Sequence, residues 1–302
     1  MRIHDLRKHW LVGAVFLSFG PPAVHAAVWN DRCMPEGDTV YLAARRLREA
    51  LAGRTLTRSD FRVPRYATVD LSGHGVDDVV SRGKHLLIRV APDVTVHSHL
   101  RMDGVWRTYR SGERWRGGPQ WQVRIVLANS AYDAVGYRIP VVDVVPRPRE
   151  DELVGHLGPD LLGPDWDPAE AARRLVARPD REIGEALLDQ CNLAGIGNVY
   201  KTELCFLRGV SPWTRVYDVG DLRPWVDLAH RLLDANKDGH AQSTTGDLRP
   251  TRRNWVYGRK TCLRCAGPIR RGRQGDPPED RVSDWCPYCQ PGPGPRGGDG
   301  GT

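Results

Sequence analysis

The sequence lacks any apolar run long enough to cross a membrane, and it contains no internal repeat. Its longest apolar run, residues 11–19, is far shorter than the ~20 residues that a transmembrane helix needs. The 32 glycines and 23 prolines argue against a helical bundle and predict many turns and loops. Hydrophobic residues still make up 40% of the 302 residues, which excludes global disorder and suits two domains rather than one.

Basic residues exceed acidic ones, 44 against 37, which gives a formal net charge of +7. An excess of this sign favours a polyanionic partner, either nucleic acid or an anionic membrane surface. Many basic proteins bind neither, so the charge alone decides nothing. Because no run could span a bilayer, we expect no membrane as a partner.

Residues 1–33 are similar to an export signal. Arg2, Arg7 and Lys8 come before the apolar run, and small residues follow it up to Ala27. However, Met34 begins a strongly patterned segment, and a start codon assigned too far upstream would give the same appearance. Both interpretations stay open at this point, and we favour an extension that is not part of the active protein.

The patterned segment predicts one helix followed by a β-rich domain. Apolar residues recur with a helical period over 39–52, where Asp38 is placed to cap the start and Gly53 to end the helix. From 55 to 145, short β-rich runs such as 86–90 and 121–127 alternate with turn residues. That alternation is typical of a sandwich or barrel.

A Pro-rich break at 145–148 separates this region from a helical one. Asp167, Pro168 and Glu170 form a capping box that predicts a helix as far as Ala177. Further helices are expected at 182–192, 199–207 and 222–235, and the Gly- and Pro-rich tail 291–302 is expected to be disordered.

Four of the seven cysteines have the spacing of a metal-binding finger: Cys262, Cys265, Cys286 and Cys289. Two CxxC pairs twenty residues apart can place four thiolates around one tetrahedral Zn²⁺. Two disulfides in an exported domain are the alternative, but the basic residues around both pairs suit a finger on nucleic acid better. The zinc would be structural, because protein fills all four positions. Cys33, Cys191 and Cys205 have no partner pattern, and we interpret the last two as buried thiols.

A glycine-rich turn precedes the helix expected at 199–207. Gly195 and Gly197 let the backbone come close to a ligand, and Asn198 is a good N-cap residue. Unpaired amides at such a helix start can hold a phosphate. A tight turn between two packed helices would have the same sequence, so the pattern alone leaves both possibilities open.

Three separated segments, 34–37, 194–198 and 286–290, together resemble the formamidopyrimidine-DNA glycosylase and endonuclease VIII family, and are nearer to the endonuclease VIII branch. The resemblance covers about 34–290. Within it, 80–87 looks like the family's lysine strand, 97–104 like its void-filling loop, and 255–259 like the segment that leads into its zinc finger.

The resemblance implies an α+β multidomain fold. Its parts would be a signal-like extension at 1–33, a catalytic β-sandwich domain with an N-terminal helix at 34–150, a helix-two-turns-helix DNA-binding domain at 151–254, a zinc finger at 255–290 and a tail at 291–302.

The activity implied is that of a bifunctional DNA glycosylase and abasic-site lyase in base excision repair. Pro35 would be the nucleophile that forms a Schiff base with the sugar, and Glu36 beside it would protonate the opening ring. Lys84, on a β-strand facing the lesion, would contact a phosphate and assist as an acid. Arg281 matches the finger arginine that grips the DNA backbone. Oxidised pyrimidines are favoured as substrates, with strand cleavage by β/δ-elimination.

The same resemblance implies how duplex DNA is held. Met102 with Arg101 is the candidate wedge that fills the space of the extruded base, although Met102 could instead belong to the core. Asn198, with Gly197 and the neighbouring amides, should hold phosphates. Lys201 could add charge or be merely solvated.

Some residues depart from the family pattern. Thr39 stands where a second glutamate is frequent, so part of the acid network is missing or moved. Acidic residues near the finger tip, Asp276, Glu279 and Asp280, should weaken phosphate contact, and 242–253 is expected to be flexible. In the 302-residue chain Pro35 is a tertiary amide without a free lone pair. Only translation from Met34 followed by removal of Met34 would free its amine.

We therefore expect a monomeric cytoplasmic, nucleoid-associated enzyme with one structural Zn²⁺, acting on duplex DNA with oxidised bases or abasic sites. A catalytically silent zinc-finger protein that binds damaged or abasic DNA is the alternative. An exported zinc-bearing protein with an unrelated role is a third possibility, which detection outside the cell would support.

Overall fold

The computed structural model describes residues 35–239, 241–277 and 280–295. The extension predicted at 1–33, with Cys33, and residues 296–302 of the predicted tail lie outside these ranges, as does Glu279. Within them, no helix is long and apolar enough to span a membrane.

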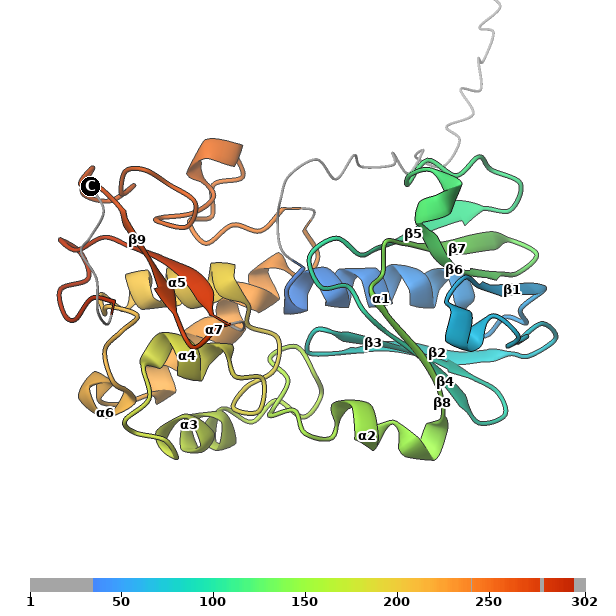
Figure 1. Cartoon of the computed structure of the whole chain (residues 1–302), viewed down its shortest axis with the longest axis horizontal. Coiled ribbons are helices and arrows are strands. Elements are labelled where there is room, and N and C mark those ends of the chain that lie inside the picture. Colours follow the sequence, from blue (N-terminus) through green and yellow to red (C-terminus); the bar gives the residue numbers. More distant parts are fainter. Residues whose placement is uncertain (1–34, 240, 278–279, 296–302) are drawn as a thin grey trace, which may run out of the picture. The chain divides into compact units, whose positions relative to one another are not determined.

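One helix and eight strands follow one another along 37–146 of the described chain (Figure 1). They are α1 (Gly37–Leu51), β1 (Arg58–Phe61), β2 (Val76–Arg82), β3 (His85–Val90), β4 (Val94–His99), β5 (Val105–Arg110), β6 (Val123–Ala128), β7 (Tyr132–Tyr137) and β8 (Val141–Pro146). The strands form two four-stranded antiparallel sheets, in the orders β1-β6-β7-β5 and β2-β3-β4-β8. The predicted sandwich with an N-terminal helix is confirmed.

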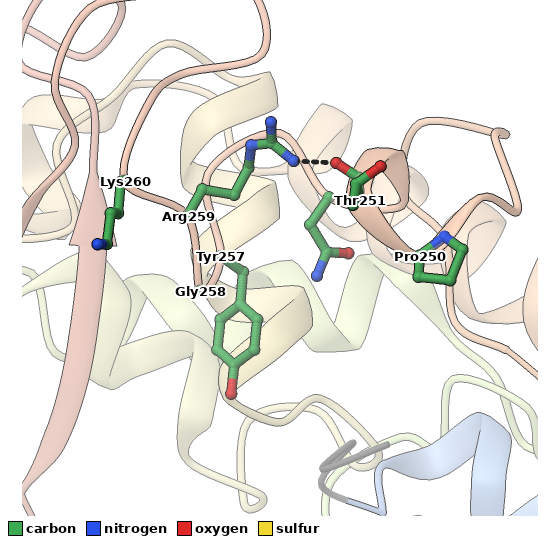
Figure 2. A pocket seen from close by; sticks show the side chains of 7 residues that line it. Pro250, Thr251, Tyr257, Gly258, Arg259 and Lys260 are labelled. Atoms are coloured by element: carbon green, nitrogen blue, oxygen red, sulfur yellow. Dashed lines mark hydrogen bonds between the residues drawn. The ribbon is translucent and has the colours of Figure 1, made fainter. Parts of the chain in front are cut away.

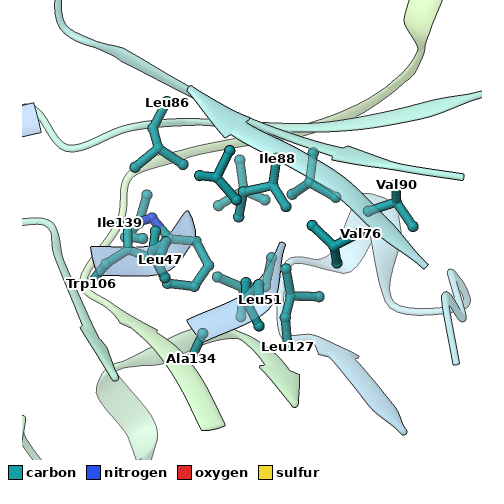
Figure 3. Close-up of a cluster of buried hydrophobic side chains, with 14 of the residues drawn as sticks. Leu47, Leu51, Val76, Leu86, Ile88, Val90, Trp106, Leu127, Ala134 and Ile139 are labelled. Atoms are coloured by element: carbon teal, nitrogen blue, oxygen red, sulfur yellow. The ribbon is translucent and has the colours of Figure 1, made fainter. Parts of the chain in front are cut away.

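The core of the sandwich is built from both sheets and α1. Figure 3 shows Leu47 and Leu51 of α1 among side chains that come from strands of each sheet. Ile88 and Leu127, one from each sheet, are completely buried. Because its apolar face is enclosed here, α1 is held firmly, and its first residues are fixed at the end of the sandwich where Pro35 lies.

The ends of two elements differ from the prediction. Glu36, not Asp38, occupies the N-cap position of α1, and Asp38 lies inside the first turn. Gly53 follows the helix end with φ +73°, as a residue after a helix terminus commonly does. β6 begins at Val123 rather than 121, because a 3-10 turn occupies 120–122.

The following region is helical, as predicted. Its helices are α2 (Asp151–Val154), α3 (Pro168–Val176), α4 (Ile183–Leu188), α5 (Asn198–Leu207), α6 (Val216–Val219) and α7 (Arg223–Asn236). Asp167 caps α3 by accepting the amide hydrogens of Ala169 and Glu170. The capping box is only half formed, because the Glu170 carboxylate pairs with Arg173 and Arg174 instead. The sequence missed α2 and α6, which are single turns too short for periodicity to reveal.

Several 3-10 turns connect these elements: η1 (Pro64–Tyr66), η2 (Gln120–Gln122), η3 (Arg147–Arg149) and η4 (Pro250–Arg252). The last of them lies in the segment that leads from α7 to the finger.

The finger contains an antiparallel hairpin of β9 (Arg270–Gln274) and β10 (Arg281–Trp285). Near the tip, the carboxylate of Asp280 is bound by the Arg273 guanidinium. The weakening of phosphate contact by Asp280 stays a prediction. At the start of the tail, the Ser211 hydroxyl donates to the carbonyl of Pro293 at 2.6 Å.

Candidate active site

Glu36 is buried and caps helix α5 across the chain. Its carboxylate accepts the amide hydrogens of Gly197 at 2.8 Å, Val199 at 2.7 Å and Tyr200 at 3.4 Å. Only 1% of Glu36 is exposed. The positive end of the α5 dipole thus faces this carboxylate. The amides that we predicted to hold a DNA phosphate are occupied by a side chain of the protein, so that prediction is wrong for these three groups.

The pKa of Glu36 reflects opposing influences. Burial and the charge of Asp38 raise the pKa of this carboxyl, whereas Lys84 and the amides of Val199 and Gly197 lower it, and the net result is a pKa of about 7. A carboxyl with such a pKa can both give and take a proton near neutral pH. Pro35 is the preceding residue in the chain.

Lys84 lies in the two-residue turn between β2 and β3, not on a strand as predicted. Gly83 precedes it with φ +56°, and its amide donates to Asp160 at 2.9 Å. Burial lowers the pKa of the Lys84 amine, Glu36 raises it, and Arg281 lowers it. Lys84 therefore interacts electrostatically with both Glu36 and Arg281, although the three residues come from different parts of the chain.

Arg281 begins β10 and is exposed, with one guanidinium nitrogen donating to the carbonyl of Asp280 at 3.0 Å. Its position on the hairpin leaves the side chain accessible to a ligand.

Close backbone packing joins the start of α1 to the glycine turn before α5. The Gly37 amide donates to the carbonyl of Gly195 at 2.9 Å. A Cβ on Gly37 would lie 2.9 Å from the Gly195 Cα, and one on Gly197 would lie 2.5 Å from the Glu36 Cδ. Both glycines are thus required by contact with other parts of the chain, rather than by a phosphate.

Asn198 is the first residue of α5, and Gly197 is its N-cap. The Asn198 side-chain amide donates to the carbonyl of Val282 at 2.8 Å, and its Oδ1 has no partner among the described residues. Asn198 therefore connects α5 to the finger hairpin, and its predicted role as the helix cap is wrong.

Lys201 is completely buried, which contradicts its predicted place in solvent. Its ammonium group donates to the Ser283 hydroxyl, and that hydroxyl donates to Gln274 Oε1 at 3.0 Å. Burial lowers the pKa of Lys201 to about 8. A side chain without exposed surface cannot reach a DNA phosphate, so Lys201 links α5 to the hairpin instead.

Asp38 forms a second buried network that the sequence did not indicate. Its carboxylate accepts from the Tyr200 hydroxyl and from the Gln242 side-chain amide, both at 2.7 Å. Burial raises its pKa above the ordinary aspartate value. The segment predicted to be flexible, 242–253, is therefore anchored at Gln242. Thr39 contributes a local contact, in which its backbone amide donates to the Asp38 carboxylate.

Glu203 anchors the start of the finger. Its buried carboxylate accepts the amide hydrogens of Trp255 at 2.8 Å, Val256 at 2.9 Å and Tyr257 at 2.8 Å. The Thr244 hydroxyl donates to the same group. An acidic residue on a helix gives no sequence signal for such a role, because its partners lie about fifty residues away.

A pocket of about 330 Å³ is lined by residues within 250–260 near this anchor, and Figure 2 shows the side chains that line it. Arg259 donates to the carbonyl of Thr251 at its rim, and Tyr257 and Lys260 also line it. The two basic side chains make the pocket suitable for an anion.

The predicted wedge residues lie on a turn after β4. Arg101 has φ +50° and is exposed, and Met102 is 59% exposed. The turn is closed by the Gly104 amide, which donates to the carbonyl of Leu100 at 2.9 Å. The alternative that Met102 belongs to the core is therefore wrong.

The four finger cysteines come together as predicted. Their sulfur atoms all lie within 4.8 Å of one another, with 3.9 Å between Cys262 and Cys289 and 3.5 Å between Cys265 and Cys286. Four sulfurs bound tetrahedrally to zinc would be about 3.8 Å apart. The cysteines are thus positioned for a metal ion. Of the remaining thiols, Cys205 is buried as predicted, whereas Cys191 is exposed, contrary to the prediction.

Comparison with known proteins agrees with this geometry. Residues 34–138 match the model of the formamidopyrimidine-DNA glycosylase N-terminal domain. A probable endonuclease 8 2 of Streptomyces coelicolor is 58% identical over 273 residues, which are 88% of this chain and 97% of that protein. The chain belongs to the formamidopyrimidine-DNA glycosylase and endonuclease VIII family, in the endonuclease VIII branch.

Other relatives support the same placement. The DNA-(apurinic or apyrimidinic site) lyase Nei2 of Mycolicibacterium smegmatis is 48% identical, over 85% of this chain and 99% of that one. A crystal structure of Lactococcus lactis formamidopyrimidine-DNA glycosylase, non-covalently bound to DNA containing an abasic site, has a TM-score of 0.69 at 21% identity. It covers 85% of this chain and all of that one. The family and the fold class predicted from the sequence are therefore confirmed.

Proposed function

We propose that this member of a DNA glycosylase and lyase family excises oxidised bases, with pyrimidines favoured, and then nicks the strand at the abasic site. The carrying observation is the buried Glu36, which lies next to Pro35, is held by the amides of α5, and interacts electrostatically with Lys84.

Pro35 is the nucleophile in this proposal. Its secondary amine attacks the sugar carbon that bears the damaged base, and the electron pair of the glycosidic bond leaves with the base. Ring opening gives an iminium between the proline nitrogen and the sugar. The iminium draws electrons from the neighbouring carbon, so a proton is lost there and the bond to the 3′ phosphate breaks in a β-elimination.

Glu36 supplies and removes protons around this intermediate. A pKa of about 7 keeps much of the carboxyl protonated at neutral pH, so it can donate to the opening ring oxygen. Lys84 lies close enough to influence that equilibrium and would hold a phosphate of the damaged strand. Arg281 would grip the same backbone from the finger hairpin.

Arg101 and Met102 fill the space that the extruded base leaves. Their exposure on a closed turn supports this assignment. Asn198, through its side chain rather than through the amides that follow it, would contact a phosphate near the lesion. We further propose one structural Zn²⁺ held by Cys262, Cys265, Cys286 and Cys289, which would fix the hairpin that carries Arg281.

The decisive test is borohydride trapping on DNA that contains one abasic site. Sodium borohydride reduces an iminium to a stable amine, so protein and DNA stay joined on a denaturing gel. We expect an adduct with protein that starts at Pro35 and none with the full 302-residue chain, in which Pro35 is a tertiary amide. Tight binding to the abasic site without an adduct from either form would instead support a silent damage-binding protein.

The substrate preference needs a separate measurement. Released bases would be quantified by chromatography from duplexes that contain thymine glycol or 8-oxoguanine. We expect faster release of the pyrimidine. Preferred release of the purine would overturn the proposed pyrimidine preference and leave the proposed mechanism unaffected. We also propose that the enzyme acts as a monomer in the cytoplasm, which light scattering of the protein with its DNA and fractionation of cells would check.

A further inference from the structure

Four histidines of the described chain lie together: His85 on β3, His97 and His99 on β4, and His156 just after α2. The His85 ring stacks on His97 with centroids 5.1 Å apart and meets the edge of His99 at 4.9 Å and of His156 at 6.3 Å. His85 and His99 are directly opposite each other in the register of β3 and β4. Since alternate residues of a strand share a face, His97 and His99 project to the same side of β4.

Hydrogen bonds fix the proton positions in this cluster. Asp143 Oδ2 lies 3.3 Å from His97 Nδ1, and the Tyr66 hydroxyl donates to Asp143 Oδ1 at 3.1 Å. A carboxylate only accepts, so His97 carries its proton on Nδ1 and its Nε2 is an acceptor. His85 Nδ1 lies 2.9 Å from that Nε2, and it must therefore be the protonated nitrogen of His85.

The other end of the cluster reaches the wedge turn. His99 Nδ1 accepts the amide hydrogen of Arg101 at 3.0 Å. This bond exists only while Nδ1 of His99 is unprotonated. Burial, together with the charges of Lys84 and Arg101, lowers the pKa of His99 to about 4, so the ring is neutral near physiological pH.

A continuous series of contacts thus runs from the sheet to the turn: Tyr66, Asp143, His97, His85, His99 and Arg101. We propose that His99 is a positioning residue for the turn 100–103, and that His85 and His97 hold its ring in the orientation that the turn requires. This inference rests on the proposed function, in which Arg101 and Met102 occupy the space of the extruded base.

His97 is the residue on which the inference is best tested. Its side chain is 4% exposed and cannot touch DNA, so any effect on base extrusion has to pass through its neighbours. His97→Phe preserves a ring to stack on His85 and removes both nitrogens. We expect single-turnover base excision from a duplex to slow about tenfold, since a small displacement of groups that position the substrate can lower a reaction rate by this much. Nicking of a single-stranded abasic oligonucleotide, which has no paired base to displace, should change less than about twofold by the same reasoning.

Thr95→Val is the matched control. Thr95 lies on the same face of β4, is completely buried and donates to Glu150, away from the turn. It should lower stability without a selective loss of duplex excision. Equal slowing by His97→Phe and Thr95→Val, in proportion to their loss of Tm, would overturn the inference, and so would an unchanged excision rate in His97→Phe.

Two variants of His99 separate the hydrogen bond from the ring. An asparagine side chain can accept from the amide two residues ahead, so His99→Asn should retain most of the duplex activity that His99→Leu loses. Equal loss in both variants would refute the role of the Arg101 bond. If the unaltered protein starting at Pro35 nicked neither substrate, the proposed function itself would fail. The inference about His99 is supported only when the unaltered protein is active and the variants lose duplex excision selectively.

Nitrogen-15 NMR gives a readout that is independent of activity. His85 and His97 should both show a protonated Nδ1 and an unprotonated Nε2. The opposite tautomer on either ring would contradict the series of hydrogen bonds, whatever the DNA assays show.

Discussion

Replacement of Lys201 by methionine should change how the stability of the protein depends on pH. Lys201 is fully buried, and its pKa falls from 10.5 in the unfolded chain to about 8. Between these two values the unfolded chain binds a proton that the folded chain has released, so folding becomes more favourable as the pH rises. A shift of this size corresponds to about 3 kcal/mol, at about 1.4 kcal/mol for each pH unit.

We therefore expect the unaltered protein to gain about 3 kcal/mol of stability relative to Lys201→Met between pH 8 and pH 10.5, and nothing between pH 6 and pH 7. Subtracting the unfolding free energy of the variant from that of the unaltered protein cancels the contributions of the other titrating groups. The Cys205 thiol, whose pKa burial raises to about 12, stays neutral throughout. Urea unfolding at constant zinc concentration would supply the free energies.

Lys237→Met is the control for this measurement. Lys237 is paired with Asp234, which raises its pKa, so its contribution is constant up to about pH 10.5 and is lost above that value. A stability difference for Lys201→Met that stays flat from pH 7 to pH 10.5 would refute the burial argument. The variant should also leave the salt dependence of DNA binding unchanged, whereas loss of a phosphate contact would reduce the slope by about one.

Three further outcomes follow from contacts at the site. In Gly197→Ala the new Cβ would lie 2.5 Å from Glu36 Cδ, so single-turnover nicking of abasic DNA should fall by at least about tenfold, and an unchanged rate would contradict the capping contact. Glu203→Gln should cost about 1–3 kcal/mol of stability and speed hydrogen exchange at the amides of 255–257, and unchanged protection there would show that the anchor is dispensable. Removal of metal by a chelator should release one zinc per chain and alter the fluorescence of Trp285, next to the cysteines, while release of no zinc would contradict the proposed ion.

The parts that could be predicted from sequence are those with local signals. The cysteine spacing, the helix at the N-terminus and the alternation of β-runs each report on residues that are neighbours in the chain. Glycines at 195 and 197 correctly indicated a close approach to a helix start. What approaches is Glu36, which is 161 residues from Gly197, and no local pattern identifies a partner at such a distance.

The misplaced lysines have two different causes. Every residue from Asn198 to Phe206 of α5 is buried, so this part of the helix has no face toward solvent. The usual assumption that a lysine is exposed therefore predicts the wrong environment for Lys201. The family resemblance implies a strand position for Lys84, which the structure does not show. The glycine before it, at φ +56°, makes a two-residue hairpin turn, a signal that the sequence contained.

The threonine at position 39 is explained by the carboxylate before it. Asp38 lies inside the helix and faces Tyr200 and Gln242, so an acid is still present at the start of α1 but is directed away from solvent. Burial raises the pKa of Glu36, Lys84 lowers it and the charge of Asp38 raises it, and the net result is a pKa of about 7. The same aspartate connects the segment after α7 to both α1 and α5, so the pKa of Glu36 and the position of Gln242 both depend on one buried group.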